Sequence, residues 1–529
     1  MRFFISLIFI FLFVIIGCKR EEDIIGSNLG NDLAFEIDTN YLYINEENEY
    51  ILHFDTVFPQ VGSATRYLKL YNRSANDINL NSVYLEEKSS SNFRINVDGE
   101  STNEKNQFSV NDVLIRSNDS IFIFADVTID PFVENNLIVE DNIIIEHDNS
   151  IKNIKLTAYG TNAYFHSGIP DLFVNSNIEF FDLTINEETI NLPFYVIDQD
   201  TDWENDKAHI IYGNVIVTNG ATLNITQGTN IFLHNNSNII IDNQSSLKMK
   251  GECYEKANSN NSWDGDKLCE GNITLEGDRL EDWYQGVPGQ WGRIWFWPGS
   301  INNEIEYTII KNGTIGIQVD GENNIDKLTE NPILNIKNSV IHNMSGLGIL
   351  AQGASVNGEN LLISNCGQYG LALNIGGKYN FNHCTFANYY VTQSRQTPNI
   401  FINNNYEDID GNMQYRPIKQ AYFRNCIIYG NNDDELIFDD NPKTEFNYYF
   451  DHCLIKTTNN EFLDKNPNFN QCLFNENPGF MDENNGNFFL DLSSPAVNIG
   501  AESKFNLDFF NVNRSNLPDL GPFETDPNL

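Results

Sequence analysis

The residues best suited to chemistry are aromatic and charged side chains gathered between positions 263 and 297. Because side chains alternate along a strand, an inward Ile294 and Phe296 would leave Arg293, Trp295 and Trp297 pointing outward. Outward aromatic rings can stack on sugar rings, and nearby polar groups can bond hydroxyls or a uronate. The cluster comprises Trp263, Trp283, Trp291, Trp295 and Trp297, with Asp278, Arg279, Glu281, Asp282 and Tyr284 as the polar candidates.

A structural role is the alternative for the same cluster. The loop at residues 276–290 would then fold back and bury the tryptophans as an internal buttress. A column of glycines, Gly316, Gly348 and Gly370, has the same two interpretations. It leaves a shallow groove for a glycan or another backbone, or it marks tight packing at a strand bend.

The sequence offers no complete set of catalytic residues for a glycoside hydrolase or a lyase. A glycoside hydrolase needs two carboxylates at a defined separation, and no stacked aspartates are expected on successive outward positions. A lyase needs basic groups near a uronate, often with calcium, but the expected outward residues Lys311, His342, His383 and His452 form no convincing trio. His383 and His452 are interpreted as solvent-facing polar residues.

Metal and cofactor motifs are equally weak, so no cofactor is expected. Calcium stays open as an alternative at residues 264–266 (Asp-Gly-Asp) and 433–435 (Asp-Asp-Glu), although each lacks a full ligand set. No CxxC pair and no His/Cys cluster with zinc spacing is present. No P-loop, GxSxG or dinucleotide motif is found.

The elements that must position these residues follow from a repeat. Six segments have a small or apolar second position, Ile or Phe at the fourth, and usually Asn at the sixth. The steps from 338 to 360, from 360 to 383 and from 425 to 452 are 22, 23 and 27 residues long, which indicates the coils of a solenoid. If the fourth position points inward, the second and sixth do too. The segments are residues 307–312, 338–343, 360–365, 383–388, 425–430 and 452–457.

Short strands broken by Gly, Asn and Asp precede this repeat, at residues 215–217, 221–225, 228–233, 239–241 and 247–251. With the Gln-Trp-Gly-Arg-Ile-Trp-Phe run at 290–296 and the closing runs at 494–500 and 518–524, they resemble right-handed parallel β-helix proteins of the pectate-lyase-like type. The resemblance spans roughly 210–524. Many members of that group are polysaccharide lyases or hydrolases, but the polygalacturonase-like catalytic motifs are absent here.

The region before the solenoid predicts a β-sandwich. Apolar runs at 67–71 and 121–127 are bounded by Asn, Asp and Ser turns, as in sandwich domains. Residues 54–57, 61–62, 71–72 and 156–160 resemble an Ig-like domain of the ASPM/SPD-2/hydin type. The resemblance implies a spacer or binding module and carries over no catalytic residue.

The N-terminus is expected to be a targeting segment. An apolar run at residues 3–16 is followed by Ile-Ile-Gly-Cys, which resembles a lipobox with Cys18 as the acylated residue; an ordinary signal peptide is the alternative. The charged run at 19–23 resembles a tether that directs lipoproteins to the outer face of the outer membrane, or is a generic linker. In such an oxidising compartment, Cys253 and Cys269 are expected to form a disulfide.

The formal net charge is −41, with 32 Lys and Arg residues in 529. It argues against nucleic acid and anionic membrane surfaces as partners, leaving the lipid anchor as the membrane contact. We expect an all-β chain with five parts: a signal peptide (1–17), a lipidated tether (18–32), an Ig-like sandwich (33–163), a linker and N-terminal cap (164–208), and a right-handed parallel β-helix with a C-terminal cap (209–529). The favoured function is a surface-exposed outer-membrane lipoprotein that engages a polysaccharide or a partner protein. The alternatives are an extracellular polysaccharide lyase or hydrolase, and a structural or adhesion component.

Overall fold

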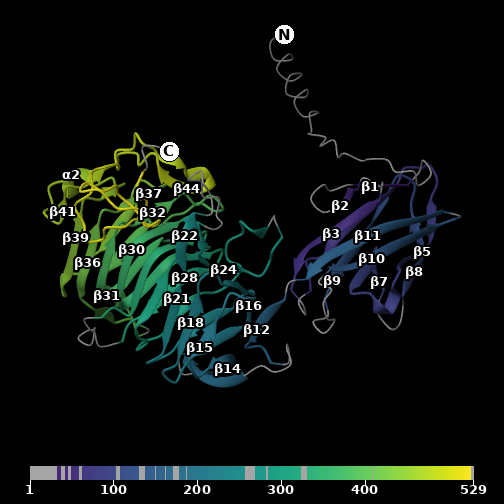
Figure 1. Cartoon of the computed structure of the whole chain (residues 1–529), viewed down its shortest axis with the longest axis horizontal. Helices are drawn as coiled ribbons and strands as arrows, with labels where there is room; N and C mark the ends of the chain where they lie inside the picture. The colour runs from purple at the N-terminus through teal and green to yellow at the C-terminus, as the bar shows by residue number, and fades with distance from the viewer. Residues whose placement is uncertain are drawn as a thin grey trace, which may run out of the picture. The chain divides into compact units, whose positions relative to one another are not determined.

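A computed structural model gives the fold of the chain (Figure 1). It describes residues 33–525 except 37–41, 46–48, 59–61, 103–107, 130–137, 149, 161, 171–177, 186–187, 257–267, 282–283, 323–330 and 409. The chain divides into two compact units, residues 1–162 and 163–529. Cys18, the lipobox and the tether lie outside the described residues. No helix among the described residues is long and apolar enough to cross a membrane.

The first unit is a β-sandwich whose two sheets share one core. Strand β4 shows why: Leu68 and Leu70 are buried while Tyr67 is exposed, so alternate side chains face the second sheet. The first sheet has the order β1 (Leu33–Glu36), β4 (Arg66–Asn72), β9 (Ser120–Val127), β6 (Phe93–Val97), β7 (Glu100–Ser101). The second has the order β2 (Leu42–Ile44), β3 (Tyr50–Val57), β11 (Ser150–Gly160), β10 (Ile138–His147), β5 (Ile78–Leu85), β8 (Ser109–Ile115), and a short 3₁₀ turn, η2 (Lys88–Ser90), follows β5.

The second unit is a parallel β-helix, in which strands of successive coils lie side by side from β12 to β42 (Figure 1). Its strands form three faces, named A, B and C here, and the strands within each face pair in parallel. Face A contains β12 (Ala163–Ser167), β16 (Ala208–Tyr212), β19 (Asn230–Leu233), β24 (Ile273–Gly277), β27 (Thr308–Lys311), the ends of β29 (Leu334–His342) and β30 (Leu347–Ser364), β32 (Thr385–Asn388), β37 (Ile427–Gly430), β40 (Leu454–Ile455) and β42 (Leu473–Phe474).

Face B contains β14 (Glu188–Ile197), β17 (Asn214–Val217), β20 (Asn238–Ile241), β25 (Ile294–Phe296), β28 (Ile315–Asp320), the starts of β30 and β31 (Leu371–Asn382), β33 (Ile400–Asn403) and β38 (Leu436–Asp439). Face C contains β15 (Thr201–Trp203), β18 (Thr222–Thr226), β21 (Ser246–Lys250), β26 (Asn303–Glu306), the start of β29, the middle of β30, the end of β31, β36 (Ile418–Arg424), β39 (Phe446–Asp451) and β41 (Phe469–Asn470). The predicted fold class, an all-β chain with a sandwich followed by a parallel β-helix, is confirmed.

The second unit also contains smaller elements outside the three faces. They are β13 (Ile178–Ile185), β22 (Glu252–Lys256), β23 (Cys269–Gly271), β34 (Asn405–Glu407), β35 (Met413–Tyr415), α2 (Asn460–Leu463), β43 (Phe480–Asp482), η5 (Glu483–Asn485) and β44 (Asn487–Leu490). Strand β13 pairs antiparallel with β14.

The solenoid begins earlier than residue 209, where the sequence placed it. Ala163 in β12 already pairs in parallel with Ala208, and Thr201 in β15 pairs with Leu223. Strands β12, β14 and β15 therefore form a first coil. Of the expected N-terminal cap, the structure shows β13, which pairs antiparallel with β14 at the end of face B.

The repeat lies on face A with the predicted inward columns. Second-position residues such as Cys384 and Cys426, and fourth-position residues such as Ile310 and Phe386, are all buried. The first position was not expected to be special, yet all six of its residues have positive φ, from 45° at Tyr307 to 54° at Asn425. It therefore needs residues that tolerate a left-handed backbone, which Asn does best among non-glycine residues.

The sixth-position asparagines form only part of the expected ladder. Asn343 Nδ2 donates to Asn312 Oδ1 at 2.8 Å, one coil away. Asn365 and Asn388 instead accept from backbone N–H groups, that of Tyr389 in the case of Asn365. The turn amides thus satisfy both each other and the backbone.

The outward side of face A is covered, which the sequence did not predict. Ile309, Val340 and Leu362 pack against apolar side chains of the C-terminal segment, including Phe488 and Phe509. The expected C-terminal cap is thus a cover along the side of the solenoid. The same region buries His383 completely, so its interpretation as a solvent-facing residue is wrong.

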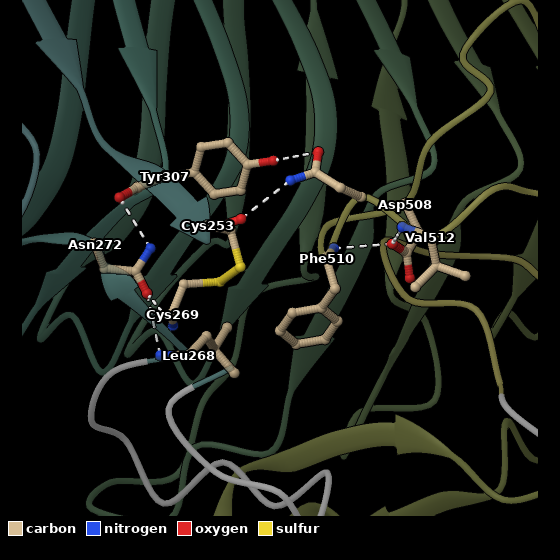
Figure 2. Close-up of a disulfide and its surroundings, with 9 residues drawn as sticks. Cys253, Leu268, Cys269, Asn272, Tyr307, Asp508, Phe510 and Val512 are labelled. Atoms are coloured by element: carbon tan, nitrogen blue, oxygen red, sulfur yellow. Dashed lines mark hydrogen bonds between the residues drawn. A yellow bond between two sulfur atoms is a disulfide. The ribbon is translucent and has the colours of Figure 1, made fainter. Parts of the chain in front are cut away.

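A disulfide joins Cys253 to Cys269, as expected, with a Cα–Cα distance of 5.0 Å (Figure 2). It ties β22 to the start of β23. Cys253 O accepts a hydrogen bond from Asn511 Nδ2, whose Oδ1 accepts from the Tyr307 hydroxyl at 2.9 Å. The disulfide therefore lies where the C-terminal segment meets face A.

Candidate functional site

The described tryptophans of the cluster, Trp291, Trp295 and Trp297, pack against other parts of the protein. Trp291 is 1% exposed and its Nε1–H donates to Lys311 O at 2.9 Å. Trp295 and Trp297 are half-buried, meet edge to face at 5.7 Å, and pack against the apolar cluster of Phe194 and Ile240. This packing fits the buttress interpretation better than a flat, exposed stacking platform.

The polar partners of Trp295 are also internal. Its Nε1–H donates to Asp320 Oδ2 at 2.7 Å. The Arg293 guanidinium bonds Gln318 Oε1 and lies 5.4 Å from the Trp295 ring. Burial raises the pKa of Asp320 and lowers that of Arg293. Arg293, Trp295 and Asp320 thus form one connected group on face B.

The other predicted site residues are not brought to this group. Asp278 accepts from the Tyr212 hydroxyl at 3.1 Å and pairs with His234 Nδ1 at 2.8 Å. Arg279 binds Glu281 and lies over the Tyr284 ring. Asp282, Trp283 and Trp263 lie outside the described residues, as do Asp264 and Asp266.

The glycine column is tightly packed and leaves no groove. A Cβ added at Gly348 would lie 2.6 Å from Ile363 Cγ2, and one at Gly316 would lie 2.6 Å from Ile341 Cγ2. All three glycines are buried. Glycine is therefore required at these positions, because atoms of the next coil fill the space that a Cβ would take.

A groove of about 410 Å³ does exist on face C. Two outward columns supply most of its lining. The first runs Glu304, Asn335, Asn357, Asn380, and the second runs Glu306, Lys337, Glu359, Asn382, with each residue paired in register to the next coil. Lys504 and Phe505 of the C-terminal segment complete the lining.

The charges of this groove are ordered by ion pairs. Lys337 Nζ lies 3.1 Å from Glu306 Oε1, and Lys250 Nζ lies 3.2 Å from Glu304 Oε2. A hydrogen bond from Lys248 is the main cause that lowers the pKa of Glu304. Glu304 and Glu306 therefore each have a lysine partner.

Glu359 differs from the other groove carboxylates. It is half-buried, and burial raises the pKa of its carboxyl above the ordinary value, against the opposing effect of Lys337. Glu306 and Glu359 are separated by one coil, so their backbones lie about 9.6 Å apart at about 4.8 Å per coil. The sequence does not reveal this pair, because the two glutamates are not stacked on consecutive coils but are separated by a coil that carries lysine.

An aromatic pair continues the first column beyond the groove. Asn380 pairs with Tyr422, which pairs with Tyr449. The two tyrosine rings are parallel within 7° and 5.7 Å apart. Face C thus presents amides, carboxylates, lysines and aromatic rings along the solenoid axis.

Metal-binding geometry is not found in the described part of the chain. It contains no group of three His, Cys, Asp or Glu residues that could hold a metal ion. In the acidic run at 433–435, Glu435 is buried against Arg395, and Asp434 accepts from Thr457 and Thr458. Both carboxylates therefore have protein partners.

The chain matches no protein-family model and no curated protein. Among solved structures, it is similar to the catalytic unit of a thermostable GH87 α-1,3-glucanase from Streptomyces thermodiastaticus, with 10% identity and a TM-score of 0.27 over 74% of this chain and 73% of that chain. It is also similar to a family 123 glycoside hydrolase from Clostridium perfringens, with 12% identity and a TM-score of 0.18. That match covers 26% of this chain and only 30% of the other. Neither likeness is close enough to assign a site or an activity.

Proposed function

We propose that this protein binds a polysaccharide along the groove of face C. The observation that carries the proposal is the pair of outward columns from Glu304 to Asn380 and from Glu306 to Asn382, which put polar side chains on every coil beside Phe505. Amide and carboxylate groups bond hydroxyls, and an aromatic ring offers a face for a sugar ring. The regular spacing of about 4.8 Å per coil suits an extended, repeating ligand.

The charge of the groove favours a glycan over other polymers. Its carboxylates are partly compensated by Lys337 and Lys504, so a hydroxyl-rich chain meets both donors and acceptors. Nucleic acid is disfavoured by the net charge of −41. A partner protein or a purely structural role at the cell surface is a weaker proposal, because neither needs the polar order of these columns.

Glycoside hydrolysis is the second candidate, favoured by the Glu306 and Glu359 pair. Inverting glycosidases hold a protonated acid and a carboxylate base about 6.5–9.5 Å apart. Burial raises the pKa of Glu359, as a general acid requires, and Glu306 forms an ion pair with Lys337. Glu306 would take a proton from a water molecule that attacks the anomeric carbon on one face of the sugar, as Glu359 protonates the leaving oxygen on the other face. A lyase is less favoured, because the groove offers no acid–base pair suited to a uronate.

We also propose that the protein is a lipoprotein of the outer membrane, anchored through Cys18 and facing the cell exterior. The lipobox-like sequence and the charged tether support this proposal. The sandwich would act as an Ig-like spacer, and the solenoid as a member of the pectate-lyase-like type of right-handed β-helix. In this arrangement, the spacer and tether separate the glycan-binding solenoid from the lipid anchor along the chain.

A glycan array with the full mature chain tests binding, and the hits are then incubated with the protein. Release of new reducing ends would establish a hydrolase, and absorbance near 232 nm would establish a lyase. Binding without either change supports a binding protein. The absence of any bound glycan would contradict the proposal and leave a protein partner, which co-purification from outer membranes would identify.

A further inference from the structure

A second cavity, of about 500 Å³, lies in the first coil of the solenoid, and it shares no lining residue with the groove of face C. Its walls come from β12, β14, β15 and the start of β16. Tyr164, His166, Tyr195, Trp203 and His209 supply its rings. Because β12 and β15 are the first strands of their faces, the cavity lies at the N-terminal end of the solenoid interior.

Two histidines in this cavity have a defined hydrogen-bond order. His209 Nε2 lies 3.0 Å from Glu204 O, which can only accept, so His209 carries its proton on Nε2. Its Nδ1 must then accept from His166 Nε2 at 2.9 Å. Burial lowers the pKa of both imidazoles, that of His166 to about 3, so both are neutral at neutral pH.

This order leaves His166 Nδ1 as a bare lone pair. The atom is buried and has no hydrogen-bond partner in the described part of the chain, and His166 is only 8% exposed. A buried acceptor without a donor is unfavourable, because no hydrogen bond offsets its loss of hydration. Because this group belongs to a residue that lines the cavity, it points to a ligand that brings a donor.

The aromatic rings hold the imidazoles in place. The Trp203 indole stacks on His166 at 4.3 Å and on His209 at 4.8 Å, while the two imidazoles are parallel within 6°. Tyr195 meets His166 edge to face, and Tyr164, which is 40% exposed, leans on His209. The Tyr164 ring is therefore the part of this wall that a ligand can stack on.

The rim of the cavity is acidic. Asp198, Asp202, Glu204 and Asp206 are exposed, and no lysine or arginine lines the cavity. Asp206 accepts from the Tyr164 hydroxyl and Asp202 from Asn224. Beside the lining, Lys207 Nζ lies 4.9 Å from the Tyr164 ring.

We infer that this cavity binds a cationic amino sugar, with its ammonium group among the rim carboxylates and a donor on His166 Nδ1. The lining combines several carboxylates with aromatic rings, which suits a sugar ring that carries hydroxyls and an ammonium. A lysine side chain would present one donor group and leave most acceptors unused. The volume fits one or two sugar rings, within the usual range of ligand pockets.

Titration calorimetry with the full mature chain tests this site at about pH 6, where amines are protonated. The probes are a glucosamine tetrasaccharide and its fully N-acetylated form, and binding is expected only for the free amine. Glu204→Gln and Asp198→Asn should each weaken binding by about two- to fivefold, as for exposed ion pairs. Asp200→Asn is the matched control, since this exposed carboxylate lies outside the cavity lining and bonds Thr222 N.

A spectroscopic readout tests the His166 contact separately. In ¹⁵N-histidine spectra, the His166 Nδ1 resonance should move upfield on ligand addition while Nε2 stays protonated. Equal binding of the N-acetylated probe, no binding of either probe, or unchanged affinity in both carboxylate variants would overturn the inference. Tighter binding of a lysine-rich peptide than of the amino sugar would assign the cavity to a protein partner instead. Face C variants should leave all these results unchanged, which separates this site from the proposed function.

Discussion

Glu306 and Glu359 occupy the same outward column of face C, with the coil that carries Lys337 between them. Lys337 Nζ contacts Glu306 at 3.1 Å, while burial raises the pKa of Glu359. One column therefore holds a carboxylate in an ion pair and a carboxyl whose pKa is raised by burial. This division of roles is what general acid and base catalysis requires.

Glutamine at either position tests whether this pair is catalytic. If the groove hydrolyses a glycan, Glu359→Gln and Glu306→Gln should each slow the release of reducing ends by about 10²–10⁴-fold, because general acid–base catalysis contributes that much. Binding of the same glycan should change little. Glu304→Gln is the control in the same groove, and equal rates in all four proteins would rule out the catalytic pair.

Glu359 should also make stability depend on pH. Its pKa is raised in the folded state, so the folded protein binds this proton more tightly than the unfolded chain does. Stability from this group is lost as pH rises through the range above its ordinary value of 4.5. The Glu359→Gln variant should thus gain stability relative to the parent between about pH 4 and pH 7. Chemical unfolding at several pH values measures this, and a constant difference would contradict it.

Trp295→Ala should affect stability and not glycan binding. The substitution removes the hydrogen bond to Asp320 and the contact with Trp297, and we expect a loss of about 2–4 kcal/mol in unfolding free energy. Trp295→Phe keeps part of the packing and should lose less. If Trp295→Ala keeps full stability but loses glycan binding, the tryptophans are the binding site and this interpretation is wrong.

Asn343→Leu tests the turn ladder of face A. Asn343 donates to Asn312 Oδ1 and to Gly286 O, and its φ is 55°. Loss of these bonds should destabilise the protein by about 1–3 kcal/mol. Asn343→Gly tolerates the same backbone but lacks the amide, so it separates the hydrogen bonds from the backbone strain. An unchanged melting temperature in both variants would contradict the ladder.

The sequence predicted the solenoid because its inward columns obey a simple alternation. Ile310 and Cys426 are buried as the pattern requires. The start of the solenoid was placed too late, because residues 163–203 lack the six-residue repeat and show their role only through pairing with the next coil.

The candidate site was less predictable, because it depends on contacts between distant segments. The C-terminal segment buries His383, and it also supplies Phe505 to the groove. Coils of unequal length hide the column that joins Glu306 to Glu359. The alternation of side chains correctly predicts that Trp295 points outward. It does not show that the Trp295 side chain bonds Asp320 and packs against Trp297.

The most direct test is calorimetric titration of an array-selected polysaccharide against the parent and a face C double variant. Asn357→Ala with Asn380→Ala removes two outward amides from the groove, and Asn235→Ala at an exposed turn between β19 and β20 is the control. We predict at least about tenfold weaker binding for the double variant, from two lost hydrogen bonds of about 1 kcal/mol each, with an unchanged melting temperature. Affinity equal to that of the parent and the control would contradict polysaccharide binding along face C.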